Sequence, residues 1–117
     1  MSSQARGDID PGTRRAIEVF RDRLASRYRV RGTVLFGSRA RRDSRNDSDA
    51  DVAVLLAGRS GSRVDVAMEL ADVAFDIMLE TGILIEPIPF WEDEWDYPEH
   101  FANPALIANI RQDGIFL

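Results

Sequence analysis

The stretch GSRARRDSRNDSDADVAVLL, residues 37–56, contains the features that decide how this chain folds. It opens with a Gly-Ser turn, passes through a polar segment rich in arginine, and ends in five apolar residues typical of a buried strand. Asp49 and Asp51 stand at the head of that strand. Because residues i and i+2 of an extended chain point to the same side, the two carboxylates are expected to converge on one divalent cation.

The Gly37-Ser38 pair ends a short β-rich run, residues 33–36, and precedes an expected helix start. Backbone N–H groups at such a junction carry partial positive charge and suit a phosphate. On its own the pair is more often an ordinary turn. The chain lacks the Gly-x-x-x-x-Gly-Lys-Ser/Thr loop, which excludes a Walker-type phosphate cradle. With the Asp pair, whose oxygen ligands beside a triphosphate favour Mg²⁺, the pattern predicts phosphoryl chemistry on a nucleotide.

The length of 117 residues predicts one small domain, residues 1–117, in which residues 1–11 form a loose polar tail. The chain contains no cysteine, no apolar run long enough for a membrane span, and no apolar signal-peptide region near its start. We therefore expect a protein of the reducing cytoplasm.

Charge is distributed unevenly along the chain. Residues 1–63 hold 14 Arg and 8 Asp/Glu, whereas residues 64–117 hold 1 Arg and 12 Asp/Glu, and the net charge is -5. An acidic chain has the wrong overall field for non-specific binding of nucleic acid, so such a partner is not expected. The basic first half suits a polyphosphate better than a duplex.

The expected elements follow the order α-β-β-α-β-α, which favours an α+β fold with helices packed on a small mixed sheet. A first helix begins near Pro11 to Thr13, buries a stripe of Ile17, Phe20, Leu24 and Tyr28, and is ended or followed by Gly32. The remaining elements are strands at 33–36, 52–56 and 83–90, and helices at 63–80 and 105–112.

Two of these elements carry more detailed expectations. Helix 63–80 is expected to bury one apolar face, made of Val64, Ala67, Met68, Ala71, Ala74, Phe75 and Met78. The strand at 83–90 contains Pro87 and Pro89, which favour the edge or the end of a sheet because proline cannot donate a ladder hydrogen bond.

The spacing of these motifs resembles that of the DNA polymerase β-like nucleotidyltransferase superfamily, in particular its minimal nucleotidyltransferase branch. The resemblance rests on Gly-Ser, ten intervening residues and Asp-x-Asp at the head of an apolar strand, within residues 33–57. It implies that Asp49 and Asp51 hold two Mg²⁺ ions and that the Gly-Ser turn binds the nucleotide's phosphates. The residues to which it gives phosphate or nucleotide contacts are Gly37, Ser38, Arg39, Arg41 and Ser48.

The resemblance also implies a third catalytic carboxylate on a neighbouring strand. Glu86 is the only acidic residue of the expected third strand and is the candidate for catalysis and metal binding. The alternative is a charge that protects an edge strand from aggregation. Glu in place of the more usual Asp, with Pro87 beside it, leaves a shifted carboxylate or weakened catalysis open.

The resemblance implies a two-metal transfer of AMP from ATP to a hydroxyl group, with Glu86 completing a metal site or accepting the proton. Three strands leave little surface to enclose a second small substrate, so another chain is expected to present the hydroxyl. Members of this branch pair with helical HEPN ribonucleases as antitoxins, and such a partner is expected here. The alternative is a catalytically weakened relative that acts by binding this partner, and the chain is also a possible oligomer.

Two features are candidates for docking. The first is an acidic row on helix 63–80 that lacks basic partners and is otherwise a solvated face: Asp65, Glu69, Asp72, Asp76 and Glu80. The second is the stretch Trp91–Tyr97, which is either an interface anchor or a flap whose rings cover the core. His100 is the only histidine and is expected to be a surface or packing residue.

Overall fold

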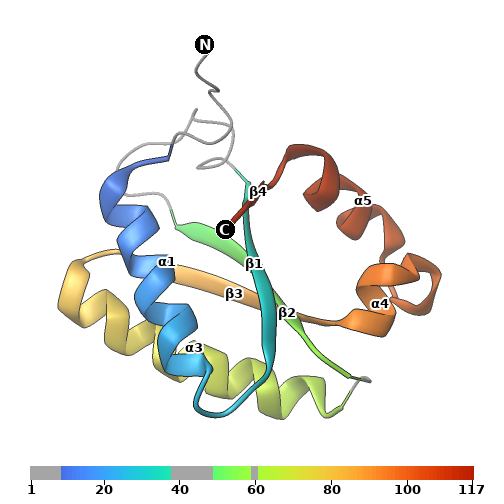
Figure 1. The fold of residues 1–117 in the computed structure, drawn as a ribbon, viewed down its shortest axis with the longest axis horizontal. Helices are drawn as coiled ribbons and strands as arrows, with labels where there is room; N and C mark the ends of the chain where they lie inside the picture. The colour runs from blue at the N-terminus through green and yellow to red at the C-terminus, as the bar shows by residue number, and fades with distance from the viewer. Residues whose placement is uncertain (1–8, 38–48, 59–60) are drawn as a thin grey trace.

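The computed structural model describes residues 9–37, 49–58 and 61–117. Its elements include the expected order α-β-β-α-β-α, with further short elements beyond residue 91, and the helices pack against a central sheet (Figure 1). The helices are α1 (Pro11–Leu24), α3 (Arg63–Thr81), α4 (Glu92–Asp96), the 3-10 turn η2 (Pro98–His100) and α5 (Pro104–Asp113). The strands are β1 (Val30–Phe36), β2 (Ala50–Leu56), β3 (Ile85–Trp91) and β4 (Ile115–Phe116).

In the described residues these strands form one mixed sheet with the order β3-β2-β1-β4. β1 pairs antiparallel with β2 and with β4, whereas β2 pairs parallel with β3 after the crossover through α3. The small α+β fold with a mixed sheet is therefore confirmed. The edge position expected for the proline-containing strand is confirmed as well, because among the described strands β3 has a neighbour on one side only.

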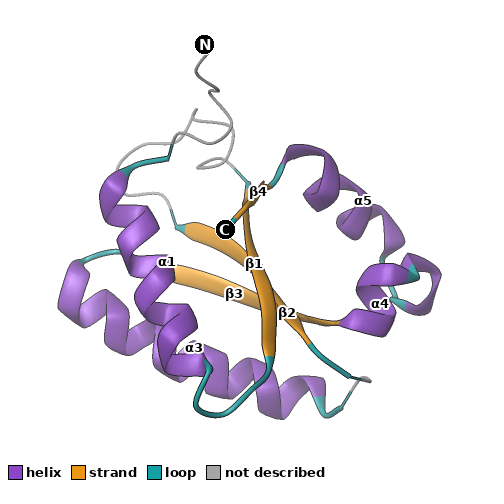
Figure 2. Cartoon of the chain, in the orientation of Figure 1, coloured by secondary structure: helices purple, strands orange, loops and turns teal. Residues whose placement is uncertain are grey.

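The two faces of the sheet carry separate apolar clusters. Val52, Val54 and Leu56 of β2 pack with α1 and α3. Ala53 and Leu55, which alternate with them, pack with α4 and α5. Figure 2 shows the two pairs of helices on different sides of the strands. This alternation decides on which face a side chain at the head of β2 lies.

Local signals at the ends of α1 and α3 explain their bounds. The Asp10 carboxylate accepts a hydrogen bond of 2.8 Å from the backbone N–H of Thr13, and Pro11 occupies the first helical position. Gly82 ends α3 in the left-handed conformation, with φ of 79°. Ile9 is buried in the core beside α1, so the tail expected over residues 1–11 was wrong at residues 9–11, and residues 1–8 lie outside the described residues.

The end expected for the first helix was wrong. α1 ends at Leu24, and Tyr28 lies beyond it, half-buried against the core. Gly32 belongs to β1, at an irregularity in the pairing between Val30 and Gly32, because the backbone here pairs with the end of β2. Pairing with β2 therefore extends β1 to seven residues, three of them before the short run expected from the sequence.

The buried face expected for the second helix was also wrong. α3 buries Leu70, Ala74 and Ile77. Of the expected set only Ala74 is buried, and Val64, Met68 and Phe75 are more than half exposed. The reason is that α3 is apolar on more than one side, so periodicity alone allowed two orientations, and packing on the sheet selected one.

The stretch Trp91–Tyr97 covers the core. Trp91 and Trp95 are 6% and 7% exposed, which confirms the flap interpretation for the two tryptophans, whereas Tyr97 is 56% exposed. The guanidinium of Arg63 lies 5.0 Å from the Trp91 ring and pairs with the buried carboxylate of Glu94. This contact ties the start of α3 to the end of β3. His100 is exposed, as expected, with its ring against Tyr97.

Candidate functional site

Asp51 and Glu86 are direct neighbours on two parallel strands. Asp51 of β2 pairs in register with Glu86 of β3 on one side and with Phe36 of β1 on the other. Asp49 lies just before β2, two residues ahead of Asp51. The sheet therefore brings together three carboxylates from two chain segments that are separated by the whole of α3.

These side chains lie on the face of the sheet opposite α1 and α3. Asp51 is in the same alternation as Ala53 and Leu55, which pack towards α4 and α5. Glu86 is in the same alternation as Ile88 and Phe90, which belong to or pack against that second cluster. The carboxylates thus share one face, at the end where β2 and β3 begin.

The electrostatics of Glu86 reflect this crowding. A side-chain hydrogen bond with Asp49, loss of hydration, and the negative charges of Asp49 and Asp51 together raise the pKa of Glu86 above its ordinary value. Glu86 is nevertheless exposed to solvent, so the crowding lies at the surface. A group of carboxylates that disfavour one another's ionisation is stabilised by a cation or by a shared proton.

Gly37 follows β1 directly and is packed against Asp51. Its φ is 77°, a left-handed conformation that favours glycine, and a Cβ atom built on it would overlap the Asp51 carboxylate. Phe36, the preceding residue, pairs with Asp51. The glycine of the expected phosphate turn and the expected metal-binding pair therefore meet in space, as they do in the sequence motif.

Four further residues were expected to contact the phosphates at this site. Ser38, Arg39, Arg41 and Ser48 lie outside the described residues, and their contacts to phosphate remain a prediction. The sequence reasoning missed Phe36 and Ile88, two half-buried apolar residues on the carboxylate face. The alternation within each strand, counted from the acidic residue, is the signal that would have found them.

The comparison with protein families agrees with this arrangement. The sequence model of the family described as Polymerase beta, Nucleotidyltransferase matches residues 20–86, which is more than half of the chain. The chain belongs to the polymerase beta nucleotidyltransferase family. The match extends from α1 to Glu86, so it includes Gly37 and all three carboxylates. No significant match was found among curated proteins.

Nucleotidyltransferases of this family typically use divalent metal ions, and the chemistry of the donors here fits such an ion. Carboxylate oxygens are the ligands that Mg²⁺ takes in proteins, and a cation offsets the repulsion that raises the pKa of Glu86. Within the described ranges, no three Asp, Glu or His side chains form a ready-made metal-binding group. Small side-chain movements would therefore be needed for these carboxylates to close on a cation.

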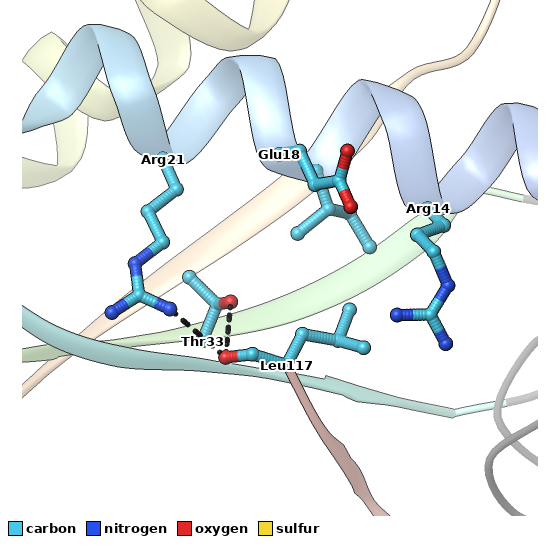
Figure 3. A pocket seen from close by; sticks show the side chains of 6 residues that line it. Arg14, Glu18, Arg21, Thr33 and Leu117 are labelled. Atoms are coloured by element: carbon cyan, nitrogen blue, oxygen red, sulfur yellow. Dashed lines mark hydrogen bonds between the residues drawn. The ribbon is translucent and has the colours of Figure 1, made fainter.

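A small pocket lies elsewhere, between α1 and the sheet (Figure 3). Its volume is about 90 Å³, well below the roughly 300–1,000 Å³ of typical small-molecule sites, so it is too small for a nucleotide. Arg21 and Thr33 both point at the backbone carbonyl of Leu117, to which Arg21 donates a hydrogen bond of 3.0 Å. The pocket is a packing feature of this nucleotidyltransferase domain, distinct from the carboxylate site.

The residues described here include no helix that is both long enough and apolar enough to cross a membrane.

Proposed function

We propose that this nucleotidyltransferase transfers AMP from ATP, with Mg²⁺, to a hydroxyl group on a partner protein of the HEPN type. The observation that carries the proposal is the meeting of Asp51 with Glu86 in register across β2 and β3, with Gly37 packed against Asp51. A turn suited to phosphate beside three carboxylates is the combination that transfer from a nucleoside triphosphate requires.

Asp49, Asp51 and Glu86 are the residues proposed to hold the cations. Two Mg²⁺ ions bound by these carboxylates would neutralise the charge that develops at the α-phosphorus and on the departing pyrophosphate. Asp49 and Asp51 lie two residues apart at the head of β2, a spacing that suits two carboxylates turned to one side of the chain. Glu86 contributes the third carboxylate from β3.

The chain's own groups also move the proton. In the proposed step the acceptor oxygen forms a bond to the α-phosphorus. The bond between the α-phosphorus and the oxygen that links it to the β-phosphate breaks, and pyrophosphate leaves with that oxygen. The proton of the acceptor hydroxyl is proposed to pass to Glu86, the carboxylate of β3 that lies in register with Asp51. Ser38, Arg39, Arg41 and Ser48 are proposed to contact the phosphates.

A transfer experiment tests the proposal. The chain is incubated with Mg²⁺, a purified HEPN-type protein, and ATP labelled either at the α- or at the γ-phosphate. We expect the partner to acquire α-label and no γ-label, and Asp49→Asn to lower the rate by at least about 100-fold, since a metal ligand is lost. Asp22→Asn, an exposed carboxylate on α1, is the matched control and should transfer at the wild-type rate.

Transfer of γ-label, or unchanged transfer by Asp49→Asn, would contradict the assignment. The alternative is a weakened relative that neutralises the HEPN protein by binding alone. It is supported by Glu86, which stands where the family more usually has Asp and has Pro87 beside it. In that case the Asp49→Asn protein would inhibit the partner as well as the wild type does, without ATP.

A further inference from the structure

The outward side of α3 is unusually apolar. Its exposed side chains include Val64 at 69%, Met68 at 64%, Phe75 at 52% and Leu79 at 66% of their full accessible area. Ala71 is exposed between them. We call these five residues the outer stripe: Val64, Met68, Ala71, Phe75 and Leu79.

The outer stripe is continuous along the helix. Its members recur at intervals of three and four residues, which places them on one face of a helix that is 19 residues long. The core-facing side is formed by Leu70, Ala74 and Ile77, all buried. α3 therefore carries two apolar faces, one used by the core and one turned to solvent.

The size of this surface points to an interaction site. Four large side chains, each more than half exposed, amount to on the order of 400 Å² of apolar surface. Contiguous patches of this size are the largest that monomers usually carry, and they often bind a partner. Packing in the core does not explain why the residues of the outer stripe are apolar, because none of the five is buried.

A row of acidic residues borders the outer stripe. Asp65, Asp72 and Asp76 each follow a stripe residue by one position and are exposed. Two further acids of the row are used within the fold: Glu69 accepts a hydrogen bond from Tyr28, and Glu80 pairs with Arg23 at 2.6 Å. The acidic row thus lies between the outer stripe and the α1 side of the molecule. The expectation that this row lacks basic partners was wrong at Glu80.

The charge of the acidic row indicates which kind of partner fits the outer stripe. After Arg63, α3 contains no basic residue, so a second copy docked stripe to stripe would offer the acidic row no basic partner from its own α3. The stripe also supplies only about half of the roughly 800 Å² per partner that a stable interface buries. The undescribed segments 1–8, 38–48 and 59–60 contain no large apolar residue except Met1, so they do not match the stripe in composition.

We propose that the outer stripe docks an amphipathic helix of another protein whose apolar side chains are flanked by Lys or Arg. Such a helix would lie against Val64, Met68, Phe75 and Leu79, and its basic residues would face Asp65, Asp72 and Asp76. The surface lies on the side of the sheet away from the carboxylates, so this inference stands independently of the transfer reaction.

A binding measurement tests the docking surface. The probe is a fluorescent synthetic peptide of about 20 residues, with Leu at every third and fourth position and Lys beside them. We expect binding that weakens at least about tenfold in the double variant Met68→Ser and Phe75→Ser, and binding that becomes less sensitive to salt in Asp72→Asn with Asp76→Asn. Tyr97→Ser, which removes an exposed aromatic ring elsewhere, is the matched control and should bind like the wild type. A peptide with Glu in place of Lys should not bind.

Several outcomes would overturn the proposal. They are equal binding by the double variant, equal binding of the Glu peptide, or a wild-type dimer in sedimentation that the double variant abolishes, since the last would make a second copy the occupant. Both changed side chains are more than half exposed, so the melting temperature is expected to stay at the wild-type value. If the double variant does not fold, hydrogen exchange on the wild type decides: protection confined to α3 on adding the Lys peptide supports the proposal, and protection elsewhere overturns it.

Discussion

Asp51 and Glu86 stand opposite each other on parallel strands, and Glu86 has its pKa raised by hydrogen bonding to Asp49 and by the charges of both aspartates. The three carboxylates therefore repel one another in the folded chain when no cation is bound. Glu86→Gln removes one charge without changing the shape of the side chain. In metal-free buffer we expect this variant to melt at or above the wild-type temperature.

Magnesium should stabilise the wild type more than it stabilises Glu86→Gln. Addition of Mg²⁺ is expected to raise the melting temperature of the wild type, because an ion that binds the folded state stabilises it by mass action. Glu86→Gln should lose most of that increase. Calorimetric scans with and without Mg²⁺ measure both effects, and an equal increase in the two proteins would show that Glu86 is not a ligand.

Gly37 provides a second test, because two glycines of the chain have nearly the same backbone conformation. Gly37 has φ of 77° and Gly82 has φ of 79°, but a Cβ at Gly37 would overlap the Asp51 carboxylate, whereas nothing lies within 4 Å of one at Gly82. Gly82→Ala should cost about 1–2 kcal/mol of folding free energy from backbone strain alone. Gly37→Ala should cost more and should also displace Asp51.

Denaturant unfolding and the transfer assay separate the two effects. Gly82→Ala is expected to keep wild-type transfer, while Gly37→Ala should lose at least about tenfold even at temperatures where it is folded. Equal transfer by the two variants would mean that the close approach of Gly37 to Asp51 is unimportant for the reaction.

Part of this fold could be predicted from the sequence because its signals are local. Five apolar residues after Asp51 indicated β2, and capping by Asp10 with Pro11 gives α1 its start. β4 could not be predicted, since two residues, Ile115 and Phe116, become a strand only by pairing with β1. The end of α1 was missed for the same reason, because pairing with β2 determines where β1 begins.

The candidate site, too, could be predicted only in part from the sequence. The spacing of Asp49 and Asp51 predicted that they share a face. Alternation in β2 places Asp51 on the face of Ala53 and Leu55, and Asp49 lies just before the strand. The identity of Glu86 as a strand residue was predictable, but its register opposite Asp51 was not, because a parallel pairing depends on how α3 crosses the sheet. The orientation of α3 was misjudged because both of its faces are apolar, and only tertiary packing distinguishes them.

The contact between Arg63 and Glu94 should be important for stability. The Glu94 side chain is 7% exposed, pairs with Arg63, and accepts a hydrogen bond of 3.2 Å from the backbone N–H of Trp91. Glu94→Gln leaves the Arg63 charge without its partner and should cost about 2–3 kcal/mol. The value is below that of a fully buried pair because the Arg63 side chain is 36% exposed.

Thermal or urea unfolding measures this loss. Glu80→Gln, which breaks the exposed pair with Arg23, is the matched control and should leave the melting temperature unchanged within error. A similar small effect at both sites would indicate that the pair with Arg63 contributes no more than a surface ion pair.

The last prediction concerns pH. The backbone N–H of Gly58 donates a 3.0 Å hydrogen bond to Glu92, and this bond, with a smaller contribution from Arg31, holds the pKa of Glu92 below its ordinary value of 4.5. A lowered pKa means that the ionised carboxylate stabilises the folded chain above the unfolded-state pKa, and that this contribution is lost as pH falls through the folded-state pKa. Glu92→Gln keeps an acceptor oxygen but has no charge to lose. Its melting temperature should therefore lie below that of the wild type at neutral pH, and the difference should close as the pH is lowered past the pKa of Glu92.

Glu99→Gln, at an exposed position of η2, is the control and should follow the wild-type curve throughout. A difference between Glu92→Gln and the wild type that stays constant with pH would show that lost packing, and not the charge on Glu92, is responsible.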